Sequence, residues 1–164
     1  MIIDCHGHYT TTPPAQQAFR DAQIARLVDP SRAAPGPAEI SDDEVRESIE
    51  RNQLRLLRER GGDVMIFSPR ASAMEHHIMD PATARDWARV SNDLIHRVTT
   101  LFPRQFVGVA QLPQTPGGDL TDSVRELHRC VDELGFVGCN LNPDPSGGFW
   151  TGRPITDPYW YPIY

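Results

Sequence analysis

The chain has 164 residues, with 16 basic and 22 acidic side chains, which gives a formal net charge of −6 when histidine is neutral. This charge argues against binding to nucleic acid or to an anionic membrane, because both need a basic surface. All 16 basic residues are arginine, which excludes Schiff-base and phosphate-loop chemistry that needs a lysine amine. Three cysteines without paired spacing, no signal peptide and no apolar run of membrane length predict a soluble cytoplasmic protein.

Four short apolar runs, each bounded by turn residues, are typical of strands buried on both faces. They cover residues 2–4, 64–67, 106–110 and 136–141. Amphipathic helices are expected between these strands and after the last one. Their predicted starts are the capping box Ser41-Asp42-Asp43-Glu44, Asp80-Pro81, Thr121 and Asp157-Pro158. The first three are expected to end at Gly61-Gly62, Leu101 and Gly135.

Strand and helix alternate strictly, which predicts right-handed crossovers and a parallel sheet. No glycine-rich loop follows the first strand, so a dinucleotide-binding fold has no support. The other common solution is a TIM-type (β/α)8 barrel, which needs about 250 residues. Because the chain ends sooner, at Tyr164 inside an expected helix, we predict an α/β fold that is the N-terminal half of such a barrel. Residues 1–164 would form one partial barrel domain of about four βα units.

Residues 9–40 are the least regular part of the sequence, because prolines interrupt a short helical pattern at residues 16–27. A long insertion after the first strand of a barrel falls on the face where active sites form. We interpret residues 9–40 as an irregular insertion that is either a lid or a solvated excursion.

The sequence Asp4-Cys5-His6-Gly7-His8 lies at the C-terminal end of the first strand. Residues two apart on a strand project to the same side, so His6 and His8 can converge on one ion while Gly7 lets the backbone bend. Neutral imidazole is a preferred zinc ligand, and a catalytic zinc takes three protein ligands plus an open position. We predict a metal site that uses both histidines and at least one further ligand. A chance pair in a turn is the alternative, which the position at a strand end disfavours.

Two neighbours of the histidines receive weaker assignments. Asp4 lies on the histidine side, where it either orients an imidazole or caps the turn. Cys5 alternates to the opposite side, and we expect it to pack against the helices rather than bind metal.

The second strand ends in Phe67-Ser68-Pro69-Arg70-Ala71-Ser72. A guanidinium group binds a carboxylate through two parallel hydrogen bonds, so Arg70 at this position predicts an anionic substrate. A structural ion pair is the competing interpretation of Arg70. His76 and His77 follow in a loop, where one of them could reach the site, although adjacent loop histidines are as often surface residues.

The fourth strand leads into Asn140-Leu141-Asn142-Pro143-Asp144-Pro145-Ser146-Gly147-Gly148. Asn140 and Asn142 share one face of the strand and, if that face points inward, can hydrogen-bond a bound carboxylate or hydroxyl. Asparagine is also a common turn former. We favour Asn142 as a residue that orients the substrate.

Four segments together carry a family likeness. They are residues 4–11 (Asp4-Cys5-His6-Gly7-His8-Tyr9-Thr10-Thr11), residues 67–72, residues 140–148 and Trp160-Tyr161-Pro162-Ile163-Tyr164. In these segments the chain resembles the 4-oxalomesaconate hydratases of the amidohydrolase superfamily, and the resemblance extends along the whole chain. The His-x-His pair alone would also suit zinc-dependent decarboxylases and lactonases of that superfamily.

The resemblance implies that His6 and His8 bind one divalent metal ion, zinc or manganese, and that the other ligands and the general acid or base lie beyond Tyr164. It implies hydration of a conjugated double bond in a tricarboxylic ring-cleavage product of gallate or protocatechuate, which gives 4-carboxy-4-hydroxy-2-oxoadipate. Residues expected to bind this small polycarboxylate are Arg70, Asn142, Ser68 and His77. The full-length protein is expected to be a homo-oligomer.

Two alternatives stay open. The first is a metal-dependent decarboxylase of the same superfamily that acts on an aromatic or muconate acid. The second is an inactive half-barrel fragment that lacks the later catalytic residues and serves only as an interaction or assembly unit. Its first and fourth strands would expose unpaired edges.

Overall fold

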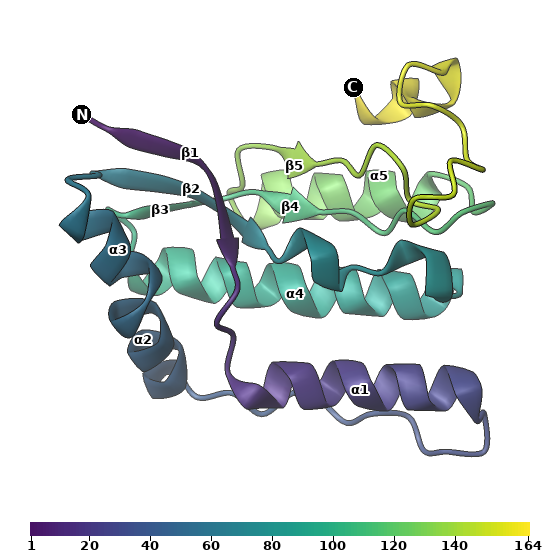
Figure 1. The fold of residues 1–164 in the computed structure, drawn as a ribbon, viewed down its shortest axis with the longest axis horizontal. Coiled ribbons are helices and arrows are strands. Elements are labelled where there is room, and N and C mark those ends of the chain that lie inside the picture. The colour runs from purple at the N-terminus through teal and green to yellow at the C-terminus, as the bar shows by residue number, and fades with distance from the viewer.

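A parallel sheet whose strands follow one another in chain order forms the centre of the fold in the computed structural model, which describes residues 1–164 (Figure 1). The strands are β1 (Ile3–Tyr9), β2 (Val64–Pro69) and β3 (Phe106–Gly108), which pair with one another, and β4 (Ala110–Gln111) and β5 (Cys139–Asn140), which form a second pair. Between β3 and β4, the Val109 N–H donates to the Phe67 carbonyl at 2.9 Å. The third predicted strand is therefore one path divided in two, and the predicted α/β class is confirmed.

Five α-helices accompany the sheet, and α4 runs along it while α1 lies outside α4 (Figure 1). Their bounds are α1 (Pro14–Val28), α2 (Asp42–Arg51), α3 (Gln53–Glu59), α4 (Pro81–Leu101) and α5 (Thr121–His128). The shorter helical elements are η1 (Ala71–Ala73), η2 (His76–Ile78) and η4 (Pro158–Ile163), which are 3-10 helices, and η3 (Arg129–Glu133), which is a π-helix. None of the helices combines the length and the apolar character needed to cross a membrane.

Two predicted helix starts are confirmed by their caps. The Ser41 hydroxyl accepts from the Glu44 N–H at 3.2 Å, and the Glu44 carboxylate accepts from the Ser41 N–H at 2.8 Å. Asp80 accepts from the Thr83 N–H at 2.8 Å, with proline at the first helical position. Each cap satisfies N–H groups that the first turn of a helix leaves without a partner.

Several elements differ in extent from their predictions. The helix expected from Ser41 to Gly61 is broken at Asn52, whose φ of −122° and ψ of −93° are not helical. The helix expected at residues 121–134 changes into the π-helix η3, and the last helix is a six-residue 3-10 helix in which Pro162 has no N–H to donate. Within the segment 9–40, α1 is a regular helix of 15 residues, longer than the interrupted pattern predicts.

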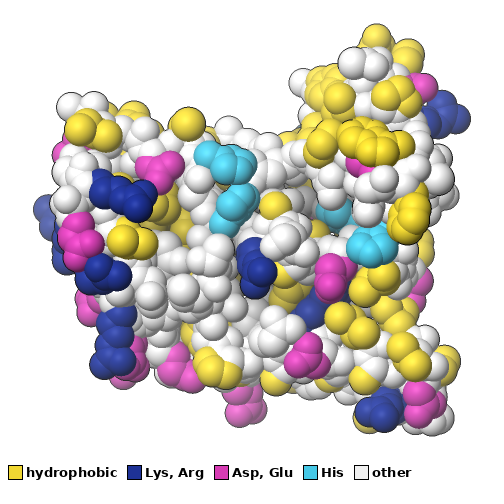
Figure 2. Space-filling view, viewed as in Figure 1, with side chains coloured by type: hydrophobic (Ala, Val, Ile, Leu, Met, Phe, Trp, Pro, Cys, Tyr) yellow, Lys and Arg dark blue, Asp and Glu magenta, His cyan; other side chains and the backbone are white.

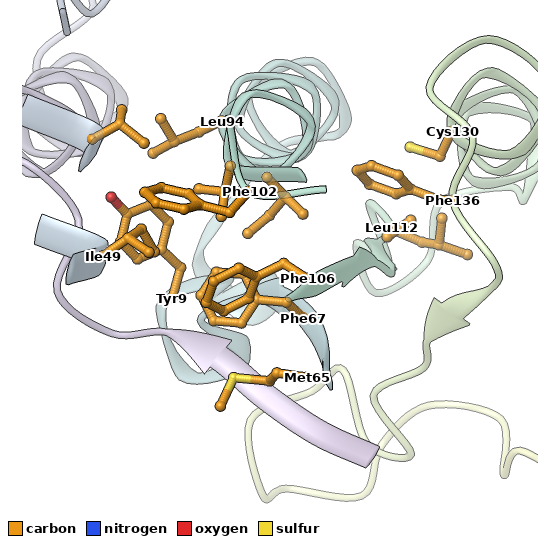
Figure 3. Close-up of a cluster of buried hydrophobic side chains, with 14 of the residues drawn as sticks. Tyr9, Ile49, Met65, Phe67, Leu94, Phe102, Phe106, Leu112, Cys130 and Phe136 are labelled. Carbon is orange, nitrogen blue, oxygen red and sulfur yellow. The ribbon is translucent and has the colours of Figure 1, made fainter. Parts of the chain in front are cut away.

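One face of the sheet is apolar and packs against the helices as the main hydrophobic core (Figure 3). Tyr9, Phe67 and Phe106 are at most 2% exposed, and the rings of Phe67 and Phe106 have centroids 4.9 Å apart. Burying a side chain such as Phe stabilises the fold by about 1.5–3 kcal/mol. Because strand side chains alternate between faces, this core directs the alternate residues His8 and Ser68 to the other face.

The sequence predicts that β1 is buried on both faces, and this prediction is wrong, but the unpaired edge expected of the first strand of a half-barrel is present. β1 pairs only with β2, and Ile2 and Ile3 are 60% and 52% exposed. Cys5, which was expected to pack against the helices, is exposed for the same reason. β1 contacts its neighbour along one side, and its N-terminal apolar residues have no layer to cover them, whereas Tyr9 at its C-terminal end is buried in the core.

The close approach of β3 to Phe136 gives a testable prediction. A methyl group at Gly108 would overlap the Phe136 ring, and that ring is only 3% exposed and cannot move freely. We expect Gly108→Ala to lower the free energy of unfolding by about 1–3 kcal/mol in urea titrations, because overpacking strains a filled core. Gly138→Ala is the matched control, since a methyl group there meets nothing within 4 Å. Equal stability of the two variants would contradict this packing account.

Candidate active site

A pocket of about 310 Å³ opens on the polar face of the sheet, at the C-terminal ends of the strands. We call it the histidine pocket, and its lining consists of His6, His8, Ala71, Ser72, His76, Gln111, Asn140, Leu141, Asn142 and Pro143. Figure 2 shows histidine side chains gathered on this face of the molecule. The lining contains no aspartate, glutamate, lysine or arginine, so its polar groups are imidazoles, amides and one hydroxyl.

His6 and His8 converge in this pocket, as their spacing predicts. Their Nε2 atoms are 3.0 Å apart, and the rings meet edge to face with centroids 4.6 Å apart. Two nitrogen ligands of one tetrahedral zinc ion, each about 2.1 Å from it, are about 3.4 Å apart. The pair therefore fits a shared divalent cation after a small separation of the rings.

The second nitrogen of His8 fixes its tautomer. Nδ1 lies 3.1 Å from the Pro69 carbonyl oxygen and 2.8 Å from the Ser68 hydroxyl. A carbonyl oxygen can only accept, so we assign the proton to Nδ1, which leaves the Nε2 lone pair free for a metal. Burial lowers the pKa of His8 below its ordinary value, and the proximity of His6 acts in the same direction, which favours the neutral, metal-binding form.

Ser68 is the centre of a hydrogen-bond network rather than a free donor to a ligand. It is 2% exposed, accepts from the Asn140 Nδ2 at 2.9 Å and lies 3.3 Å from the Gly7 carbonyl. A hydroxyl has one donor and two acceptor positions, and bonds from Asn140 and His8 with one to Gly7 use all three. The network therefore favours a positioning role for Ser68 over the substrate contact that the sequence predicts.

Other residues around the histidines are placed as follows. The Asp4 carboxylate accepts from the His6 N–H at 3.1 Å, which makes it the turn cap of the two expected alternatives. Gly7 does not have a positive φ, but a methyl group there would overlap the Met65 side chain. Gly7 is therefore needed for space and not for backbone freedom. The strand register shifts between Asp4 and Gly7, which bends β1 at the site.

Arg70 lines a neighbouring pocket with Tyr9, Thr10 and Gln16. Its Nε donates to the Ser72 hydroxyl at 2.8 Å, and Ser72 lines the histidine pocket. The exposed guanidinium forms no ion pair within 4 Å among residues 1–164, so no partner in this chain supports the competing interpretation of a structural ion pair. Arg70 lies at the boundary between the two pockets.

Of the two loop histidines, the structure brings His76 into the pocket and leaves His77 outside its lining. His76 is 2% exposed, and its Nδ1 accepts from the Gln114 N–H at 3.2 Å. Burial, followed by the charge of Arg20 and the proximity of His77, lowers the pKa of His76 to about 4. His76 is therefore neutral at pH 7. The ring of His77 packs against Gly147, where a methyl group would overlap it.

The η1–η2 segment that carries His76 is held by α1. The buried guanidinium of Arg20 donates to the Met74 carbonyl at 3.0 Å and to the Glu75 carboxylate at 3.2 Å, and it lies 5.0 Å from the centroid of the Trp87 ring. α1 is thus anchored beside the site, and residues 29–40 are the part of the segment 9–40 after α1 that has no regular helix or strand. No pattern in the sequence distinguishes Arg20 from the other arginines.

Asn142 is held mainly through its backbone. Its N–H donates to the Gln114 Oε1 at 2.7 Å, and its carbonyl accepts from the Gln114 Nε2 at 3.1 Å. Its side-chain oxygen accepts from the Asp144 N–H at 3.0 Å, as expected for an asparagine in a turn. Asn142 lines the pocket beside Asn140, and its role toward a substrate stays a prediction.

Gln111 is a pocket residue that is not among the predicted site residues. It follows the apolar Ala110 on β4, and alternation places it on the polar face with His8. That alternation was the available signal, but the residue sits within a run interpreted as a fully buried strand. No group of three or more His, Cys, Asp or Glu side chains in residues 1–164 could hold a metal ion, so His6 and His8 form a pair without a third ligand of those types.

Residues 3–164 match the model of the family described as amidohydrolase. The chain belongs to the amidohydrolase family. It is 58% identical over 164 residues to 2-keto-4-carboxy-3-hexenedioate hydratase from Sphingobium sp., a match that covers 100% of this chain and 48% of the relative. The chain spans about half the length of the curated relative.

The fold of the chain is also similar to those of solved structures. 4-Oxalomesaconate hydratase from Rhodopseudomonas palustris matches 100% of this chain and 48% of its own, with 51% identity and a TM-score of 0.91. A dihydroxybenzoic acid decarboxylase from Polaromonas sp., solved with bound manganese, matches 86% of this chain and 38% of its own, with 29% identity and a TM-score of 0.55. With the parallel strands in chain order, these matches confirm the predicted partial TIM-type barrel.

The Ser68 network gives a second prediction. In the complete natural protein, we expect Ser68→Ala to weaken divalent-cation affinity by about 10- to 100-fold, because His8 loses an orienting partner. Cation affinity is measured by competition with a chromogenic chelator. Ser123→Ala is the control, since Ser123 is equally buried but bonds to the Pro113 carbonyl instead. Unchanged cation affinity together with a raised KM would restore the substrate-binding interpretation of Ser68.

Proposed function

We propose that the protein carrying this chain is a metal-dependent hydratase that adds water to the conjugated double bond of 4-oxalomesaconate and forms 4-carboxy-4-hydroxy-2-oxoadipate. The observation that carries the proposal is the convergence of His6 and His8 at an Nε2 separation of 3.0 Å, in a chain 58% identical along its whole length to a hydratase of this class. We propose zinc as the native ion. The manganese in the decarboxylase relative makes manganese the second candidate.

Each residue has a distinct task in this proposal. His6 and His8 hold the cation through Nε2, and the His8 Nδ1–H bond to Pro69 prevents that ring from turning away. A divalent cation held there would supply Lewis-acid chemistry, polarising the oxo group conjugated with the alkene so that water can add. We expect the general acid or base outside this pocket, beyond Tyr164, because the pocket lining has no carboxylate.

Arg70 and the amides bind the substrate's carboxylates. An exposed guanidinium without an ion-pair partner at the pocket boundary can bind a carboxylate by donating two parallel hydrogen bonds to it. Asn142 orients the substrate in this scheme, and His77 supports the loop that carries Gly147. Neutralising one carboxylate also reduces the repulsion among the three that the substrate carries.

A metal-dependent decarboxylase is the second candidate. The 29% identity to the manganese-containing decarboxylase favours it, because the same histidine pair could serve either reaction. Incubating the purified complete protein with 4-oxalomesaconate separates the two candidates. Hydration removes the conjugated absorbance and releases no carbon dioxide, whereas decarboxylation releases one equivalent. Release of carbon dioxide, or no loss of absorbance, would refute the hydratase.

The histidine pair, His6 and His8, gives the third prediction. We expect His6→Ala and His8→Ala each to reduce kcat by more than about 100-fold and to lower the bound metal per protein, because the cation loses a ligand. Metal content is measured by atomic emission and kcat by the absorbance assay. His128→Ala is the control, since His128 is an exposed residue at the end of α5. Full metal content and full activity in both variants would show that His6 and His8 do not form the metal site.

Arg70 gives the fourth prediction. We expect Arg70→Ala to raise KM by about 10- to 100-fold, because a charge-assisted pair with a carboxylate is lost. Arg70→Lys should recover only part of the loss, since an ammonium group cannot form the two parallel bonds. Arg104→Ala, an exposed arginine before the start of β3, is the control. A KM for Arg70→Ala equal to that of the natural protein would dismiss its carboxylate role.

A further inference from the structure

The buried wall of the histidine pocket holds an amide donor without a partner. Gln111 is 2% exposed, and its Nε2 has no hydrogen-bond partner among residues 1–164. Burying an amide N–H without a partner costs about 1–3 kcal/mol. A side chain kept in such a position is stabilised only when a ligand or an ordered water supplies the acceptor.

The backbone that carries this amide is firmly held. The Asn92 side chain donates to the Gln111 carbonyl and accepts from the Gln111 N–H, each at 2.9 Å. Asn92 is itself fully buried in α4 and also donates to the Glu126 carboxylate at 2.8 Å. The Gln111 side chain therefore starts from a fixed point, which reduces the entropy lost when it binds a ligand.

His76 supplies a second donor in the same pocket. Its Nδ1 is occupied as an acceptor from the Gln114 N–H at 3.2 Å, so the neutral ring carries its proton on Nε2. Burial and the nearby Arg20 keep the ring neutral by lowering its pKa to about 4. A neutral imidazole that donates a hydrogen bond at pH 7 is a known way to bind a substrate oxygen.

We propose that Gln111 Nε2–H and His76 Nε2–H together bind one carboxylate of the substrate in the pocket that His6 and His8 line. Gln111 and His76 both line this pocket, whose lining has no carboxylate. Two N–H donors there would suit an oxygen group with several lone pairs, and hydrogen bonds to a carboxylate are stronger than those to a neutral oxygen. Arg70 lies at the boundary with the neighbouring pocket and would hold a different carboxylate. The inference rests on the proposed function for the identity of the substrate, but not for the chemistry of the two donors.

The test uses tricarballylate, a saturated tricarboxylate that cannot be hydrated, as a probe of binding to the complete metal-loaded protein. We expect Gln111→Met to weaken tricarballylate binding in calorimetry, and to raise KM for 4-oxalomesaconate, by about 10- to 100-fold. The melting temperature should stay equal or rise, because methionine fills similar space without a buried unpaired donor. A merely structural glutamine would give a lower melting temperature and unchanged binding.

A second variant tests the histidine separately. His76→Asn keeps an acceptor for the Gln114 N–H but loses the Nε2 donor, so we expect the same weakening of binding with the bound metal unchanged. Gln23→Met is the matched control, because Gln23 is a buried glutamine on α1 with an unpartnered Oε1 outside the histidine pocket. It should bind tricarballylate like the natural protein.

The outcomes separate this inference from the proposed function. We refer to the proposed pair of donors, Gln111 and His76, as the carboxylate anchor. If the natural protein hydrates 4-oxalomesaconate, and Gln111→Met and His76→Asn bind tricarballylate as tightly as it does, the carboxylate anchor is wrong and the hydratase stands. If the natural protein has no hydratase activity and the variants still lose tricarballylate binding, the anchor stands and the hydratase fails. Failure of the natural protein to bind tricarballylate at all would overturn the anchor.

Discussion

The bond from His8 Nδ1 to the Pro69 carbonyl is the contact on which the candidate site depends. It joins the C-terminal ends of β1 and β2, and it determines which nitrogen of His8 faces the pocket. The parallel register that pairs His8 with Ser68 and Tyr9 with Pro69 makes this bond available. If the register of β1 slipped by one residue, its side chains would move to the other face of the sheet. The core that buries Tyr9 and Phe67 therefore also keeps His8 on the face where it can bind metal.

The two faces of the sheet divide stability from function. Met65, Phe67 and Phe106 bury apolar surface against the helices and stabilise the fold. The alternate positions carry His8, Ser68 and Gln111, and Gln111 leaves a buried amide without a partner. Such a group lowers stability unless a ligand binds it, which is the pattern expected where a protein keeps polar groups for binding.

Sequence reasoning succeeded where a strong local rule applied. The spacing of His6 and His8 predicted their convergence, and the caps at Ser41 and Asp80 predicted where α2 and α4 begin. It failed where the answer depends on contacts distant in the sequence. The Ser68 network needs Asn140, which is 72 residues away, and the choice of His76 over His77 is not encoded by a local pattern.

A crystal structure of the complete metal-loaded protein, with anomalous diffraction at the metal's absorption edge, will show whether His6 and His8 share one divalent cation. For zinc, we expect a single anomalous peak about 2.0–2.1 Å from both Nε2 atoms, with His8 Nδ1 still bonded to Pro69. A peak that contacts neither ring, or imidazoles turned to opposite sides of β1, would show that the two histidines do not form a metal site.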